Sequence, residues 1–368
     1  MSPHPTSVPG GATPGRILAL PRYDRLGASS RLRFFDLLPY LADAGLTVTT
    51  VPFFDDAYLA RLYAGQGVDR LALAGHYRRR LSTLARGGGE LLWIEKEALP
   101  WLPAALERGL FRGRPYVLDF DDAWHLRYAG HRLAPLRQLL GDKLERLVAG
   151  AALTVVANET LADWATGARA RALLRLPTPV DLARYRSASA PPRPTGGFRV
   201  AWIGTPSSAR YLEALAGPLA DVAATGPLTL VTIGSAPVNL PGVPEEFIAW
   251  SETGEAAALA GVDAGIMPLA PTAFAQGKSG FKLLQYMAAG KAVVASPVGE
   301  NRRIVTDGAT GLWAESPEDW VRALSALRAD ADLRRRLAAA GQALVARDYD
   351  LAVLGPRLTA ALAKLIRP

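Results

Sequence analysis

Cysteine is absent from this 368-residue sequence, and histidine and methionine occur only four and three times. Without cysteine, neither a disulfide framework nor a thiolate metal site can form. No apolar run approaches the ~18 residues that a membrane-spanning helix requires. Residues 1–15 are rich in proline, glycine, serine and threonine and contain no apolar core, so we expect a disordered tail rather than a signal peptide. Together these features predict a cytoplasmic protein.

The length and charge of the chain indicate how many domains it has and what kinds of partner it can bind. A chain of 368 residues exceeds the roughly 250–300 that one hydrophobic core usually serves, which predicts two domains. The net charge of +8 suits phosphate-bearing substrates, an anionic membrane face or nucleic acid, although a compositional bias towards arginine is an alternative explanation. Zinc-finger spacing, basic regions with heptads and aromatic RNA-binding motifs are all missing, so no nucleic-acid partner is expected.

Apolar runs alternate with helical periodicity in both halves of the chain. A strand predicted at 16–21 leads into a loop with Gly27 and then a helix, and a strand predicted at 198–203 leads into a glycine-led turn and a helix. Such alternation is typical of doubly wound α/β domains. We further expect a strand at 46–54, a long helical region at about 57–86, and helices at 133–149 and 209–224.

The segment 187–197, rich in proline and glycine, is the clearest linker in the chain. The predicted organisation is therefore a tail at 1–15, a first Rossmann-like domain at 16–186, this linker, a second Rossmann-like domain at 198–349, and a C-terminal helix at 350–368 that packs back on the first domain.

Two lysines stand at the start of a predicted helix, which is an unfavourable place for them. Lys278 and Lys282 follow Gly277 in a loop of small residues, and the helix dipole disfavours cations there by roughly 0.3–1 kcal/mol each. A bound anion such as a phosphate would explain them, and two solvated surface lysines are the alternative. Arg210, in the helix that follows Gly204, repeats the pattern.

Carboxylates gather at the end of another predicted strand. Asp119, Asp121, Asp122 and His125 follow an apolar run, and crowded carboxylates repel one another. Such a cluster can orient sugar hydroxyls, bind a metal or order a loop. A structural role as a helix cap is the remaining alternative.

The second half carries a pattern that identifies a resemblance. The run Met287-Ala-Ala-Gly-Lys-Ala-Val-Val-Ala295 and the preceding Gly277-Lys-Ser-Gly-Phe-Lys-Leu-Leu-Gln-Tyr resemble the family 4 retaining glycosyltransferases, in particular a bacterial subgroup with this Gly-Lys-x-Gly-Phe-Lys-Leu-Leu-Gln-Tyr-Met motif. The resemblance covers nearly the whole chain after the tail. It implies the GT-B fold, in which two Rossmann-like domains face a cleft. At the positions of the two glutamates that the family usually keeps, this chain has Gly277 and Gln285.

The resemblance also implies a function. It implies a hexosyltransferase-type, metal-independent enzyme that moves a sugar from a nucleotide-sugar donor to a glycan or lipid-linked acceptor, with retention of anomeric configuration, in cell-envelope polysaccharide biosynthesis. The donor would be a substrate, and no cofactor is expected.

The resemblance and the local patterns together give the candidate site residues. As catalytic residues we take the predicted diphosphate clamp and the acidic cluster, namely Arg210, Lys282, Asp121, Asp122 and His125. The candidates for binding the donor nucleotide are Gly204, Thr205, Ser207, Gly234, Lys278, Ser279, Gly280, Phe281 and Gln285. The candidates in the acceptor-side loop are Gly27, Ala28, Ser29 and Arg31. Asp119 and Asp121 are interpreted as cleft residues rather than metal ligands, and no metal site is assigned.

The sequence also fits other functions. Loss of both motif glutamates also fits a GT-B-like binding or scaffold subunit without catalysis, and an epimerase or hydrolase of nucleotide sugars could use the same fold. The arginines at 78–80, with Arg86 and Trp101, could hold the first domain against an anionic membrane surface, which would make the protein peripheral at the inner face of the cytoplasmic membrane. A solvated basic helix face is the simpler interpretation.

Overall fold

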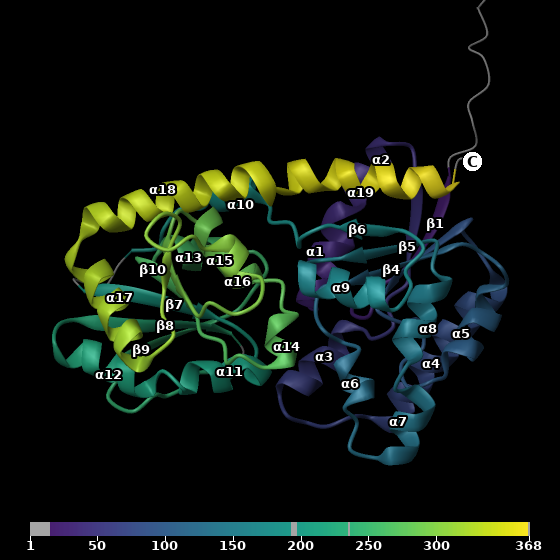
Figure 1. The fold of residues 1–368 in the computed structure, drawn as a ribbon, viewed down its shortest axis with the longest axis horizontal. Helices are drawn as coiled ribbons and strands as arrows, with labels where there is room; N and C mark the ends of the chain where they lie inside the picture. The colour runs from purple at the N-terminus through teal and green to yellow at the C-terminus, as the bar shows by residue number, and fades with distance from the viewer. Residues whose placement is uncertain (1–14, 193–196, 235, 367–368) are drawn as a thin grey trace, which may run out of the picture.

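The computed structural model describes residues 15–192, 197–234 and 236–366, and it leaves the side chain of Ser207 undescribed. The predicted tail, except Gly15, and residues 193–196 of the predicted linker therefore lie outside the described residues. The described part of the chain forms two six-stranded parallel sheets flanked by helices, which lie side by side (Figure 1). The predicted α/β fold with two doubly wound domains is confirmed.

The first domain is built on the sheet with strand order β2-β1-β3-β4-β5-β6. Its strands are β1 (Arg16–Leu20), β2 (Thr47–Thr50), β3 (Leu91–Glu95), β4 (Tyr116–Phe120), β5 (Leu153–Val156) and β6 (Leu173–Arg175). Every residue of β3 and β4 is buried, as expected for central parallel strands that helices cover on both faces. The helices are α1 (Ala28–Arg33), α2 (Leu38–Asp43), α3 (Asp56–Tyr63), α4 (Arg70–Arg86), α5 (Ala104–Phe111), α6 (Leu126–Ala129), α7 (Ala134–Leu140), α8 (Lys143–Gly150) and α9 (Glu159–Gly167).

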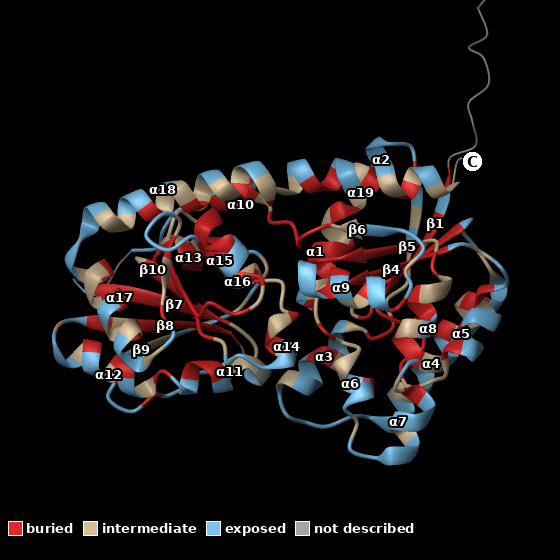
Figure 2. Cartoon of the chain, viewed as in Figure 1, coloured by how far each residue is buried: buried red, intermediate tan, exposed pale blue. Residues whose placement is uncertain are grey.

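The second domain repeats this architecture with strand order β12-β11-β10-β7-β8-β9. Its strands are β7 (Phe198–Ile203), β8 (Leu228–Gly234), β9 (Glu245–Ala249), β10 (Ala264–Met267), β11 (Ala292–Ala295) and β12 (Leu312–Trp313). Its helices are α10 (Leu182–Arg186), α11 (Pro206–Glu213), α12 (Ala216–Ala224), α13 (Glu255–Ala260), α14 (Ala273–Gln276), α15 (Phe281–Ala288), α16 (Asn301–Ile304), α17 (Pro317–Ala329) and α18 (Ala331–Asp348). Figure 2 shows the buried strands at the centre of each domain and the exposed outer faces of the helices.

Three stretches that the sequence predicts as helical are each divided into two helices. The helix predicted at 57–86 breaks between α3 and α4, where Gly65 and Gly67 have φ of 68° and 72° in the left-handed region. The helix predicted at 133–149 breaks between α7 and α8, and the helix predicted at 209–224 breaks between α11 and α12. The last two breaks are only two residues long and barely shift the apolar spacing, so periodicity does not reveal them. The strand predicted at 46–54 is shorter than expected, and β9 was not predicted.

The chain crosses between the domains earlier than the sequence indicates. Leu182 and Tyr185 of α10 are buried in the core of the second domain, although the sequence analysis assigns residues up to 186 to the first. The crossing lies at Val180, whose N–H donates to the Tyr349 carbonyl and whose carbonyl accepts from the Leu351 N–H, both at 2.9 Å. The segment that leaves the first domain at Val180 and the segment that returns to it after Tyr349 are therefore hydrogen-bonded to each other.

The last helix, α19 (Leu351–Ile366), lies over the first domain, as predicted. Leu354, Leu358 and Leu362 are buried in a core cluster with Phe34 and Trp93 of that domain. Figure 1 shows α18 and α19 running one after the other along the same side of both domains. Within the described residues, no helix combines the length and apolarity needed to cross a bilayer.

Candidate active-site cleft

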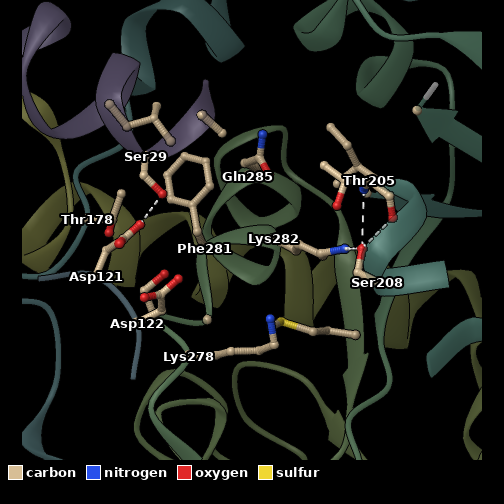
Figure 3. Close-up of a pocket in the computed structure, with 18 of the residues that line it drawn as sticks. Ser29, Asp121, Asp122, Thr178, Thr205, Ser208, Lys278, Phe281, Lys282 and Gln285 are labelled. Carbon is tan, nitrogen blue, oxygen red and sulfur yellow. Dashed lines mark hydrogen bonds between the residues drawn. The ribbon is translucent and has the colours of Figure 1, made fainter. Parts of the chain in front are cut away.

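A cavity of about 590 Å³ lies between the two domains. The first domain lines it with α1, the loop after β4 and Thr178, and the second domain lines it with the loops after β7, β8 and β10 and the start of α15 (Figure 3). These loops follow the carboxyl ends of parallel strands, the edge where open α/β sheets bind ligands. Of the candidate residues, Ala28, Ser29, Arg31, Asp121, Asp122, Gly204, Thr205, Arg210, Gly234, Lys278, Ser279, Gly280, Phe281, Lys282 and Gln285 line this cavity.

Lys282 places a cation at the floor of the cavity. Its Nζ lies 3.4 Å from the Ser208 hydroxyl and 4.3 Å from the centroid of the Trp202 ring. Burial of the amine, together with the nearby Lys278 ammonium, lowers the pKa of Lys282 to about 7. A cation held away from water in this way is costly unless a ligand compensates it.

Two further cations border the same space. Lys278 lies over the rings of Phe274 and Tyr211, and the Arg210 guanidinium lies over the Tyr211 ring. Within the described residues, neither of them nor Lys282 forms an ion pair with a carboxylate. Three basic side chains therefore border one side of the cavity without a carboxylate in ion-pair contact, which is the arrangement of an anion site.

Glycines make room for this arrangement. A Cβ at Gly204 would lie 2.6 Å from Lys282 Nζ, and one at Gly234 would lie 2.5 Å from the Gly204 carbonyl oxygen. Gly280 opens α15 with φ of 68°, and a Cβ there would meet Ile304 Cδ1 at 2.4 Å. Close approach and left-handed backbone thus require glycine at these positions.

The acidic pair faces the cations from the first domain. Ser29 donates a hydrogen bond to Asp121, and Lys96 Nζ lies 2.8 Å from Asp121 Oδ1 and 3.6 Å from Asp122 Oδ2. Although burial opposes ionisation, Lys96 and Ser29 hold the pKa of Asp121 below its usual range. Burial raises the pKa of Asp122 despite Lys96. Asp121 is thus held as an acceptor, while Asp122 is more available to a ligand.

Lys96 is a site residue that sequence reasoning missed. It has φ of 63° and follows β3 directly, so its ammonium reaches the acidic pair on the neighbouring loop after β4. Nearby charges raise its pKa above the usual range, so Lys96 stays charged. The signal was present in the sequence, because Glu95, Lys96 and Glu97 place charges at the carboxyl end of a buried strand.

Two members of the predicted acidic cluster lie elsewhere. Asp119 is buried and forms an ion pair with Arg33, so the prediction that it faces the cleft is wrong. His125 does not line the cavity. Its ring stacks on Trp164 with centroids 4.3 Å apart, and burial lowers its pKa to about 4. We therefore assign His125 a packing role.

The acceptor-side loop is only partly in the cavity. Gly27 caps α1 and does not line the cavity, and a Cβ there would come within 2.4 Å of Tyr23 Cβ, so it is a turn residue. Ala28 and Ser29 do line the cavity. Arg31 reaches the second domain, where its guanidinium lies 4.7 Å from the centroid of the Trp250 ring.

Gly277, at the first missing glutamate, lies at the domain interface. A Cβ there would come within 2.6 Å of Ala123 Cβ in the first domain. The Asn158 side-chain amide donates to the carbonyls of Gly277 at 2.9 Å and Lys278 at 3.2 Å. No larger side chain fits at this position while the domains keep this contact.

The predicted basic surface of α4 is not uniform. Arg80 is buried and donates to the carbonyls of Pro21 and Val51, and burial lowers its pKa to about 9. Arg78 and Arg86 are exposed. Arg80 therefore cannot contact a membrane. Among the described residues, no group of three or more histidine, aspartate or glutamate side chains is arranged to hold a metal ion.

Known glycosyltransferases resemble this chain both in sequence and in structure. Residues 198–330, somewhat over a third of the chain, match the family model described as "Glycosyl transferases group 1". A comparison with curated proteins gives no match.

Solved glycosyltransferase structures share the whole architecture. Sucrose-phosphate synthase from Thermosynechococcus elongatus superposes with a TM-score of 0.70 at 14% identity, covering 95% of this chain and 99% of that chain. Anabaena HepE in complex with UDP-glucose gives 0.66 at 15% identity, with coverages of 95% and 99%. WaaG, a glycosyltransferase involved in lipopolysaccharide biosynthesis, gives 0.68 at 14% identity, with coverages of 94% and 99%. The chain therefore has the predicted GT-B fold, and its second domain matches the group 1 glycosyl transferases.

Proposed function

We propose that this protein is a glycosyltransferase that moves a sugar from a nucleoside-diphosphate donor to a glycan or lipid-linked acceptor. One observation carries the proposal: the cations Lys282, Lys278 and Arg210, which have no carboxylate partner among the described residues, face the acidic pair Asp121–Asp122 across one cavity. One wall suits a diphosphate, and the other suits sugar hydroxyls.

The second domain would hold the donor. A diphosphate beside Lys282 and Arg210 would replace the missing negative charge, and both groups would stabilise the charge that develops on the leaving nucleoside diphosphate. These side chains suffice to balance that charge, so we propose transfer without a metal ion or other cofactor. The fold shared with HepE, whose structure is solved with UDP-glucose, supports a nucleotide sugar as donor.

The first domain would hold the acceptor. Asp122 lines the cavity with a side chain that is 24% exposed, so its carboxylate can accept a hydrogen bond from a sugar hydroxyl. Asp121 is held by Lys96 and Ser29, which makes it a poor nucleophile. With Asp121 engaged and Asp122 assigned to the acceptor, we propose front-face transfer with retention, in which the leaving phosphate takes the acceptor proton.

We further propose a cell-envelope acceptor and a peripheral position at the membrane. WaaG shares the fold and is involved in lipopolysaccharide biosynthesis. On α4, exposed Arg70 and Arg78 accompany Leu71, which is 86% exposed. Basic side chains beside an exposed apolar residue suit an anionic lipid surface. Salt-sensitive binding to vesicles of acidic but not neutral lipid would support this, and equal binding to both would contradict it.

A binding subunit without catalysis is the second candidate, favoured by Gly277, which removes the side chain that would read the donor sugar. A stability screen with UDP, GDP, ADP and CDP, followed by transfer assays with the matching nucleotide sugars, distinguishes the two. An enzyme gives a thermal shift and a glycosylated product with the donor's anomeric configuration. A shift with no product for any acceptor would favour the binding subunit, free or isomerised sugar would indicate a hydrolase or an epimerase, and no shift would remove the basis of the proposal.

A further inference from the structure

One asparagine of the first domain contacts the loop that carries Lys278 in the second. Asn158 is 1% exposed and caps α9, where its Oδ1 accepts a hydrogen bond from the Leu161 N–H at 2.9 Å. Its Nδ2 crosses the interface and donates to the carbonyls of Gly277 and Lys278. These two residues belong to the segment between α14 and α15, at the junction of the domains (Figure 1). One side chain thus serves a helix of one domain and a loop of the other.

The hydrogen-bonding capacity of an amide explains why asparagine stands at this position. The amide oxygen accepts, and the NH₂ group has two hydrogens to donate. With the oxygen directed at Leu161, the nitrogen must face the interface, and its two hydrogens match the two carbonyls. Within the described residues, neither carbonyl accepts a hydrogen bond from a backbone N–H. Serine and aspartate also cap helices well, but neither of them can donate two hydrogen bonds.

Lys278 depends on the first domain through its side chain as well. Its Nζ lies 5.2 Å from the centroid of the Phe274 ring, and Phe274 of α14 packs against the core of the first domain. The backbone and the ammonium group of Lys278 are therefore both in contact with groups that the first domain positions. Lys282, by contrast, lies over the ring of Trp202, which belongs to its own domain.

We infer that Asn158 is a positioning residue for the diphosphate: from the first domain, it holds the Gly277–Lys278 backbone so that the Lys278 ammonium faces the cavity. The inference rests on the proposed function. It means that the anion site of the second domain is complete only while the two domains are in contact. When they separate, Lys282 keeps its surroundings, whereas the loop of Lys278 loses two hydrogen bonds and the contact made by Phe274.

The test removes the two donated hydrogen bonds and keeps the helix cap. Asn158→Ser retains a capping oxygen but is too short to reach the two carbonyls, and Asn158→Asp keeps the shape but turns an oxygen towards them. Dissociation constants are measured by calorimetry for inorganic pyrophosphate and for the nucleoside diphosphate that gives the largest thermal shift. Because binding must then order the loop first, Asn158→Ser should raise both constants about three- to tenfold, and Asn158→Asp at least as much.

A double variant separates positioning from a general loosening of the fold. Lys278→Met should weaken binding about 10- to 100-fold. In that background, Asn158→Ser should cause no further loss, because the group that it positions is gone. Asp69→Ser is the matched control, since Asp69 caps α4 at an exposed position of the same domain, and it should keep the wild-type affinity. Binding is compared at a temperature at which circular dichroism shows every variant to be folded.

Three results would overturn the inference. If wild-type protein binds a nucleoside diphosphate and both Asn158 variants bind it as tightly, the positioning role is wrong while the proposed function stands. Additive losses in the double variant would show that Asn158 acts through a group other than Lys278. If neither pyrophosphate nor any nucleoside diphosphate binds to the wild-type protein, the proposed function itself fails, and the inference fails with it.

Discussion

Gly277 and Ala123 meet across the domain interface so closely that a Cβ on Gly277 would lie 2.6 Å from the Ala123 Cβ. Any side chain at 277 must push the domains apart or displace the loop after β4, which carries Asp121 and Asp122. The missing first glutamate is therefore coupled to how closely the two domains approach. The small residue permits a tighter contact, and under the proposed function other groups would have to bind the donor sugar.

Gly277→Ala should open this contact. Because the new Cβ meets Ala123, we expect the radius of gyration from small-angle scattering to increase and sugar transfer to fall. Gly109→Ala is the matched control, since a Cβ at this α5 glycine meets nothing within 4 Å. An unchanged scattering curve for Gly277→Ala, with full activity, would contradict this expectation. It would show that the loop after β4 shifts to accommodate the new Cβ while the domains stay in place.

Lys282→Met should separate ligand binding from stability. The change keeps an unbranched side chain of similar size beside Trp202 but removes the charge that lies over its ring. Nucleoside-diphosphate affinity should therefore fall about 10- to 100-fold, the worth of a charge-assisted hydrogen bond. The empty protein should melt at a higher temperature, because a poorly solvated charge is gone. Lys364→Met, at an exposed position of α19, serves as the control. Unaltered affinity would exclude Lys282 from the anion site.

Nucleotide affinity should depend on pH through Lys282. Its pKa is about 7 in the empty site, and a bound diphosphate favours the charged form and raises that pKa. Below pH 7 the amine is already charged. Above pH 7, binding must take up a proton, so affinity should fall by up to about tenfold per pH unit. Calorimetry at pH 8 in buffers of different ionisation enthalpy should detect this uptake, and Lys282→Met should abolish it. A pH-independent affinity in the wild-type protein would contradict the assignment.

Asp122→Asn should impair transfer without impairing donor binding. The amide keeps the shape of the side chain but loses the charge that strengthens a hydrogen bond from an acceptor hydroxyl, so kcat should fall about 10- to 100-fold. The dissociation constant for the nucleoside diphosphate should stay close to the wild-type value, because the diphosphate binds on the opposite wall. Asp332→Asn, on the exposed face of α18, controls for the loss of one negative charge. Equal losses in kcat and nucleotide affinity would instead assign Asp122 to the donor site.

The sequence predicted the parts of the site that depend on local pattern. Lys278 and Lys282 were found because cations are unusual at a helix start. Gly204 was found because a glycine-led turn follows a predicted strand, and Gly280 because it belongs to the flexible entry of the same helix as the lysines. The residues that sequence reasoning missed or misplaced depend on neighbours far along the chain. His125 leaves the site because Trp164 offers its ring a stacking partner, and Asp119 because Arg33 pairs with it. Asn158 and Lys278, 120 residues apart, meet only across the domain interface.

The two crossings between the domains have a consequence for motion. The chain leaves the first domain at Val180 and returns at Asp350. Backbone hydrogen bonds at Val180 connect these two segments to each other. Two covalent links that coincide in space act as a single hinge rather than as two separate tethers. The two domains could then move apart as rigid bodies about this hinge with little change to either sheet. Such a motion would separate the basic side chains of the second domain from Asp121 and Asp122 of the first. Substrate entry and product release would share this one axis.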